Sequence, residues 1–126
     1  MTGRAARLYR RVHLESAPPP RLLLEVFSHL DQDLEAARRA IAALHVPAKA
    51  RAIDHALALL GQLEAALDHQ AAPALCRDLA ASYAFCKQRL LLASARLDPA
   101  PLEDVARVLG PIRQAFEQVI ERPPPP

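Results

Sequence analysis

The stretch Tyr9–Phe27, YRRVHLESAPPPRLLLEVF, decides how this chain folds. A basic arm that carries one tyrosine runs into three consecutive prolines, and a leucine-rich segment follows them directly. Proline disfavours the helical conformation of the residue before it, but the first turn of a helix accepts it, because that N–H has no helical partner anyway. We therefore expect no helix to cross this point and a long helix to start near Pro19.

The first long helix is predicted to run from Pro19 to about His45, and Pro47 ends it. Its apolar residues recur at steps of three and four, which is typical of a helix with one buried face. The predicted buried stripe is Leu22, Val26, Leu30, Leu34, Ala37, Ile41 and Leu44. Leu23 and Phe27 fall beside this stripe, so we expect them at the edge of the core, where a partner can reach them.

Three more amphipathic segments follow, at about 48–69, from Pro73 to Leu97, and from the cap-like Asp98 onward. Pro111 lies inside the last segment and is expected to kink the helix or to mark a local break, because it has no N–H. Four such helices with short links predict an all-α, antiparallel up-down four-helix bundle over residues 19–122. A basic arm or short helix at 1–18 precedes it, and a polyproline tail at 123–126 follows.

Composition narrows the classes of function. The 126 residues suit one domain, and the formal charge of +2 is too small to indicate a nucleic-acid partner. The sequence has no apolar run long enough to span a bilayer, so membrane insertion is not expected. The arginines at the start are not followed by the apolar segment of a secretory signal, although a basic amphipathic start also resembles an organelle transit peptide.

The pattern of reactive residues gives little sign of chemistry. Carboxylate-bridged di-metal bundles use a Glu-x-x-His spacing on two helices, whereas Glu25 and His29 are four residues apart and have no matching pair. Phosphate-binding glycine loops, HExxH motifs and a nucleophile with an evident histidine base are all missing from the sequence. We therefore expect no metal, no cofactor and no catalytic residue.

The two cysteines, Cys76 and Cys86, fall ten residues apart in one predicted helix. At about 1.5 Å of rise per residue they are roughly 15 Å apart, beyond the reach of a disulfide. We expect both to be free thiols that pack in the interior, as a reducing cytoplasm would give.

Four blocks of residues occur in a characteristic order along the chain. They are Tyr9 with Ser16–Pro19 and Leu22–Phe27, the run Leu59–Asp68, Tyr83 with Leu90 and Ala93–Ser94, and Asp104–Val105 with Ile112–Phe116. In this order and spacing, over about Tyr9 to Ile120, the chain resembles the flagellin-specific export chaperones, the FliS family.

Several positions depart from that family's pattern. Pro18 stands where the family has a capping serine, Phe27 where it has tyrosine, His29 where it has glycine, Ser94 where it has asparagine and Phe116 where it has tryptophan. Most of these changes keep the apolar character of the position, so we expect the fold to persist. Their effect is expected on the choice of partner.

The resemblance implies a cytoplasmic chaperone without catalytic activity, present as a monomer or weak dimer. Such a chaperone binds the disordered C-terminal segment of flagellin, prevents premature polymerisation and delivers the segment to the export gate of the type III apparatus. Two alternatives remain at this point. One is a structural or regulatory helical bundle of a secretion system that does not bind flagellin, and the other is a metal or cofactor bundle.

A cargo segment would lay its apolar residues into grooves between neighbouring helices. Leu8, Tyr9 and Val12 share an apolar face that either caps such a groove when cargo is absent or completes the core. Tyr83 either lines the groove or is a core residue, and Ser94 is placed to hydrogen-bond the cargo backbone. The predicted partner-binding residues are Leu8, Tyr9, Val12, Leu23, Phe27, Tyr83, Leu91 and Ser94.

Overall fold

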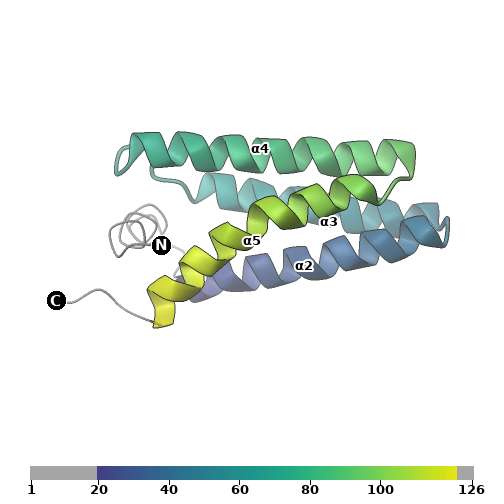
Figure 1. The fold of residues 1–126 in the computed structure, drawn as a ribbon, viewed down its shortest axis with the longest axis horizontal. Helices are drawn as coiled ribbons and strands as arrows, with labels where there is room; N and C mark the ends of the chain where they lie inside the picture. Colours follow the sequence, from purple (N-terminus) through teal and green to yellow (C-terminus); the bar gives the residue numbers. More distant parts are fainter. Residues whose placement is uncertain (1–19, 122–126) are drawn as a thin grey trace.

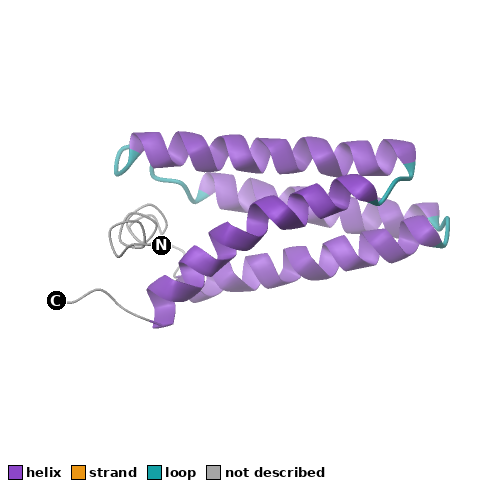
Figure 2. Ribbon diagram, in the orientation of Figure 1, coloured by secondary structure: helices purple, strands orange, loops and turns teal. Residues whose placement is uncertain are grey.

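The computed structural model describes residues 20–121, and every regular element in that range is an α-helix (Figure 1, Figure 2). The helices are α2 (Pro20–Ala42), α3 (Val46–Ala65), α4 (Pro73–Arg96) and α5 (Ala100–Glu121). Each helix packs on its neighbours in sequence, and α5 closes the ring against α2. The predicted all-α four-helix bundle is confirmed, while the arm at 1–18 and the tail at 123–126 lie outside the described residues.

The turn between α2 and α3 shows how the chain ends one helix and starts the next. Leu44 takes a left-handed conformation with a φ of 54°, and the N–H of His45 then donates to the Ala40 carbonyl at 2.9 Å. His45 in turn caps α3, because its Nδ1 accepts a hydrogen bond from the Ala48 N–H at 3.0 Å. Pro47 therefore belongs to the first turn of α3, where proline is well accepted.

The turn between α4 and α5 repeats the same design. Leu97 has a φ of 51°, and the N–H of Asp98 donates to the Ala93 carbonyl at 3.1 Å. The Asp98 carboxylate then accepts a hydrogen bond from the Ala100 N–H at 2.9 Å. Asp98 therefore acts as the cap of α5, as its sequence predicts.

The core side of α2 differs from its prediction over the first two turns and at Leu44, which is exposed in the turn after the helix. Leu23 and Phe27 are each 1% exposed, whereas Leu22 is 46% exposed. Both series, starting at Leu22 or at Leu23, have helical spacing and both reach Leu30, so spacing alone cannot choose between them. Burial of the Phe27 ring, whose centroid lies 5.6 Å from that of Phe116 on α5, selects the second.

The centre of the bundle is built from large apolar side chains contributed by all four helices. The most deeply buried of these are Leu30, Leu60, Leu63, Tyr83, Leu90, Val105 and Phe116. Tyr83 is completely buried, so it is a core residue. Because the interior is filled by apolar side chains, a binding site is expected on the surfaces between the helices.

Helix α5 runs without interruption through Pro111. The alternative of a local break at this proline is therefore wrong. Pro111 is exposed, and polar contacts on both sides of it bind α5 to its neighbours, Asp104 to Arg89 and Arg113 to Asp31. Figure 1 shows α5 starting beside the end of α4 and finishing beside the start of α2.

Candidate functional site

The α3–α4 face is the surface on which the described structure brings predicted binding residues together. Lys87 of α4 pairs with Glu64 of α3 at 3.0 Å, which marks the sides of the two antiparallel helices that face each other. Leu91 lies one turn beyond Lys87 on that side of α4, and Gly61 lies one turn before Glu64 on that side of α3. Ser94 lies one more turn along α4, on the same side as Leu91.

A second polar contact joins α3 and α4 near the end of the bundle that holds the α2–α3 turn. The Nζ of Lys49 on α3 donates to the backbone carbonyl of Ser94 at 3.1 Å. This bond satisfies a carbonyl in the last turns of α4 and places a positive charge at the negative end of that helix. The backbone carbonyl of Ser94 is therefore bonded to α3. The prediction that Ser94 hydrogen-bonds the cargo concerns its side chain, which is half-buried.

Exposed apolar side chains give this face its character. Leu91 is 55% exposed and Val46, in the first turn of α3, is 51% exposed, while Leu57 is partly buried between the helices. Leu44 and Leu97 are also exposed, but each occupies the left-handed position of a turn, which accounts for its orientation. Val46 and Leu91 have regular helical geometry, so their exposure is not a consequence of a turn.

Gly61 is the second distinctive feature of the α3–α4 face. It lies in the interior of α3, where glycine costs about 1 kcal/mol relative to alanine. A Cβ added at this position would meet nothing within 4 Å, so packing inside the chain does not require glycine here. Its effect is to leave a flat place on the α3 side of this face, where the backbone of a partner can approach closely.

The other predicted binding residues are placed differently. The expectation that Leu23 and Phe27 lie at the edge of the core is wrong, because both are buried at the contact of α2 with α5. Tyr83 lies in the core, one of its two predicted places. Leu8, Tyr9 and Val12 lie outside the described residues. Lys49 was missed, because only the pairing of α3 with α4 reveals it as a neighbour of Ser94.

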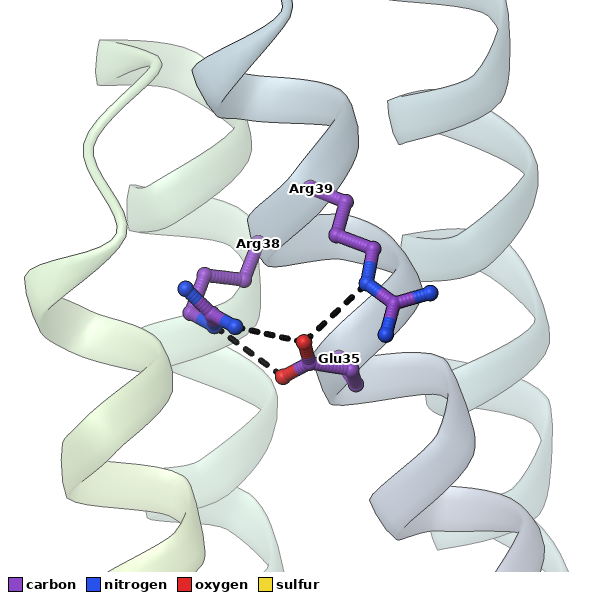
Figure 3. A network of polar contacts seen from close by, with 3 residues as sticks. All are labelled: Glu35, Arg38 and Arg39. Carbon is purple, nitrogen blue, oxygen red and sulfur yellow. Dashed lines mark hydrogen bonds and ion pairs between the residues drawn. The ribbon is translucent and has the colours of Figure 1, made fainter.

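Charged side chains on α2 form a separate network on its exposed side (Figure 3). One carboxylate oxygen of Glu35 lies 2.5 Å from Arg38 Nη2 and 3.1 Å from Arg39 Nε. The hydrogen bond from Arg38 is the main reason that the pKa of Glu35 lies below its usual value. All three side chains are in contact with solvent, so the network adds little stability, and it occupies arginines that could otherwise contact an anion.

Residues 20–121 do not bring three or more histidine, cysteine, aspartate or glutamate side chains into a group that could hold a metal ion. The metal-bundle alternative therefore finds no ligand set in this part of the chain. Within the same range, none of the four helices is both long and apolar enough to cross a membrane.

The two cysteines are free and buried, so we expect them to resist alkylation in the folded protein. Burial raises the pKa of the Cys86 thiol to about 12, and it also raises that of Cys76, whose Sγ donates to the Asp68 carbonyl at 3.1 Å. At pH 8 only about one Cys86 thiol in ten thousand would be the reactive thiolate. Mass spectrometry after iodoacetamide treatment should show unmodified native protein and doubly modified protein in urea. If Cys86 in native buffer were modified as fast as added glutathione, this burial would be contradicted.

Comparison with known proteins agrees with the fold and extends over its whole length. The family described as Flagellar protein FliS matches residues 1–123. A relative from Salmonella typhimurium, the flagellar secretion chaperone FliS, is 28% identical over 123 residues, which cover 94% of this chain and 91% of the relative. The match includes all four helices as well as the separate sequence blocks. The chain belongs to the FliS family of flagellar proteins.

Proposed function

We propose that this protein is a cytoplasmic flagellar export chaperone that binds the disordered C-terminal segment of flagellin. It keeps that segment from polymerising too early and delivers it to the type III export apparatus. Membership of the FliS family supports the general role. The observation that carries the binding proposal is the α3–α4 face, where Leu91 of α4 is exposed, Gly61 leaves α3 without a side chain, and Val46 adds apolar surface at one end.

The physical basis of this binding is the burial of apolar surface by a segment that is disordered on its own. Leu91 and Val46 offer apolar area to a cargo side chain, and Gly61 lets the cargo backbone come close. Ordering the segment costs entropy, which lowers the affinity for a given area but allows a large surface to be covered. Such binding needs neither covalent chemistry nor a nucleotide, and the cargo can be released intact.

Calorimetric titration with the C-terminal segment of the flagellin from the same organism tests the proposal. We expect micromolar or tighter binding with a negative heat-capacity change, because apolar surface is buried. Removal of residues 1–15 should tighten binding if the arm with Leu8, Tyr9 and Val12 caps the groove. Absence of binding by both forms would refute the flagellin proposal and favour a structural or regulatory bundle of the secretion system.

Substitutions on the α3–α4 face locate the site. Leu91→Asp and Gly61→Arg should each weaken binding at least tenfold, because one places a charge in the apolar surface and the other fills the flat place. Leu44→Asp is the matched control, since it removes an exposed leucine outside this face and should leave the affinity unchanged. Gly61→Ala should raise the stability of the bundle by up to about 1 kcal/mol. Equal effects of Leu91→Asp and Leu44→Asp would show that the cargo does not use this face.

A further inference from the structure

Helix α5 has a weak point near its middle, at Gly110–Pro111. Glycine and proline are the two residues with the poorest propensity for a helix interior. Pro111 cannot donate a hydrogen bond to the carbonyl of Arg107, and a Cβ at Gly110 would meet nothing within 4 Å. Packing therefore does not demand either residue, and the two halves of α5 are joined by fewer helical hydrogen bonds than their length allows.

The ion pairs that the two halves of α5 make with other helices reach different partners. Before the weak point, Asp104 pairs with Arg89 of α4 at 3.8 Å. After it, Arg113 pairs with Asp31 of α2 and donates to the Ser28 hydroxyl of the same helix at 3.2 Å. Figure 1 shows the same division, since α5 leaves α4 along its length and ends beside α2.

The second half of α5 contacts α2 through apolar side chains with polar side chains at the rim. Phe116 packs on Phe27, and Leu23 is buried one turn away on the same side of α2. At the rim, the side chains of Arg113 and Asp31 are 33% and 54% exposed, and ion pairs so open to water hold weakly. Arg113 also pairs with Glu117 of its own helix at 3.1 Å, so its charge stays partnered when it leaves α2.

We propose that residues 112–121 of α5 form a hinged cover that opens away from α2 at Gly110–Pro111. The described structure is the closed state, in which Phe116 packs against Phe27. In the open state the apolar residues of the flagellin segment take the place of Phe116. This second step rests on the proposed function, whereas the opening itself is a property of the free chain.

Native-state hydrogen exchange of the full chain, without any ligand, tests the opening. Amides of 112–118 should exchange at least tenfold faster than those of 101–109, through a step that leaves α3 and α4 protected. Pro111→Ala should slow the exchange of 112–118 at least tenfold and leave 101–109 unchanged. Arg113→Gln should accelerate it. Equal exchange of both halves, in the natural chain and in Pro111→Ala alike, would overturn the hinge.

A fluorescent reporter separates opening of the cover from fraying of the last turn. The chain contains no tryptophan, so Phe116→Trp introduces a single reporter at the covered contact. If this variant keeps its helical content and cooperative melting, acrylamide should quench it at a rate that falls when Pro111→Ala is added. Quenching that is insensitive to Pro111→Ala would mean that residue 116 does not take part in the opening.

Titration of the same variants with the flagellin segment distinguishes a failure of this inference from a failure of the proposed function. We expect Pro111→Ala to weaken binding at least threefold, because it favours the closed state. Fast exchange of 112–118 without any binding would support the hinge and refute the proposed function. Tight binding that Pro111→Ala does not change would leave the function standing and overturn the role of the cover in it.

Discussion

Replacing Phe27 with alanine should lower the free energy of unfolding by about 3–5 kcal/mol. The ring of Phe27 is buried between α2 and α5 and lies against Phe116, so its loss removes apolar contact and leaves a cavity where two helices meet. Urea denaturation followed by circular dichroism measures this loss. Phe27→Leu keeps most of the volume and should cost clearly less, which provides a folded variant if the alanine variant is too unstable to study.

Leu91→Ala is the control for Phe27→Ala, because both positions fall beside the predicted core stripes and were candidates for partner contact, while the structure buries one and exposes the other. Leu91 is exposed on α4, so its truncation should change stability by no more than about 0.5 kcal/mol. Leu91→Ala should instead weaken binding of the flagellin segment, since Leu91 lies on the proposed binding face. If Phe27→Ala proved as mild as Leu91→Ala, the burial of Phe27 under α5 would be contradicted.

The second large effect is a gain of stability from glycine at the two left-handed turn positions. Leu44 and Leu97 have φ values of 54° and 51°, a conformation in which a Cβ clashes with the following carbonyl and costs roughly 1–2 kcal/mol. Both side chains are exposed, so little apolar burial is lost on their removal. After allowance for the greater freedom of glycine in the unfolded chain, Leu44→Gly and Leu97→Gly should each add about 1 kcal/mol.

Urea midpoints, at an unchanged dependence on denaturant, measure these gains. Leu44→Ala and Leu97→Ala are the matched controls, because alanine keeps the Cβ that causes the strain while it removes the rest of the side chain. The glycine variants should be more stable than the alanine variants at both turns. A glycine variant less stable than the natural chain would show that the leucine contributes a contact greater than its backbone strain.

Local sequence signals predicted the four-helix architecture correctly. They failed where two series of apolar residues fitted the helical spacing equally well. Pro20 and the cap at Asp98 mark helix starts that the structure confirms. On α2, the series from Leu22 and from Leu23 have the same spacing, and only the position of Phe116 on a helix more than eighty residues away decides between them. At Pro111 the sequence allowed either a kink or a local break, and the structure excludes the break because α5 is one continuous helix.

The candidate binding face was harder to predict than the fold, because it depends on how α3 and α4 align. Leu91 could be selected from its position beside the core stripe of one helix. From the sequence, Gly61 is either a weak position in α3 or a place of close backbone approach, and only the pairing of Lys87 with Glu64 puts it on the side of α3 that faces α4. Lys49 was not selected at all, since its partner is a backbone carbonyl 45 residues away.

The short turn between α2 and α3 has a consequence for the order in which the chain folds during synthesis. Only residues 43–45 separate these helices, and their contact is the most extensive between any two helices of residues 20–121. A helical hairpin closed by so short a loop forms from near neighbours in sequence and forms quickly. This first half can therefore be assembled while the ribosome is still making α4 and α5, which then add to a preformed surface.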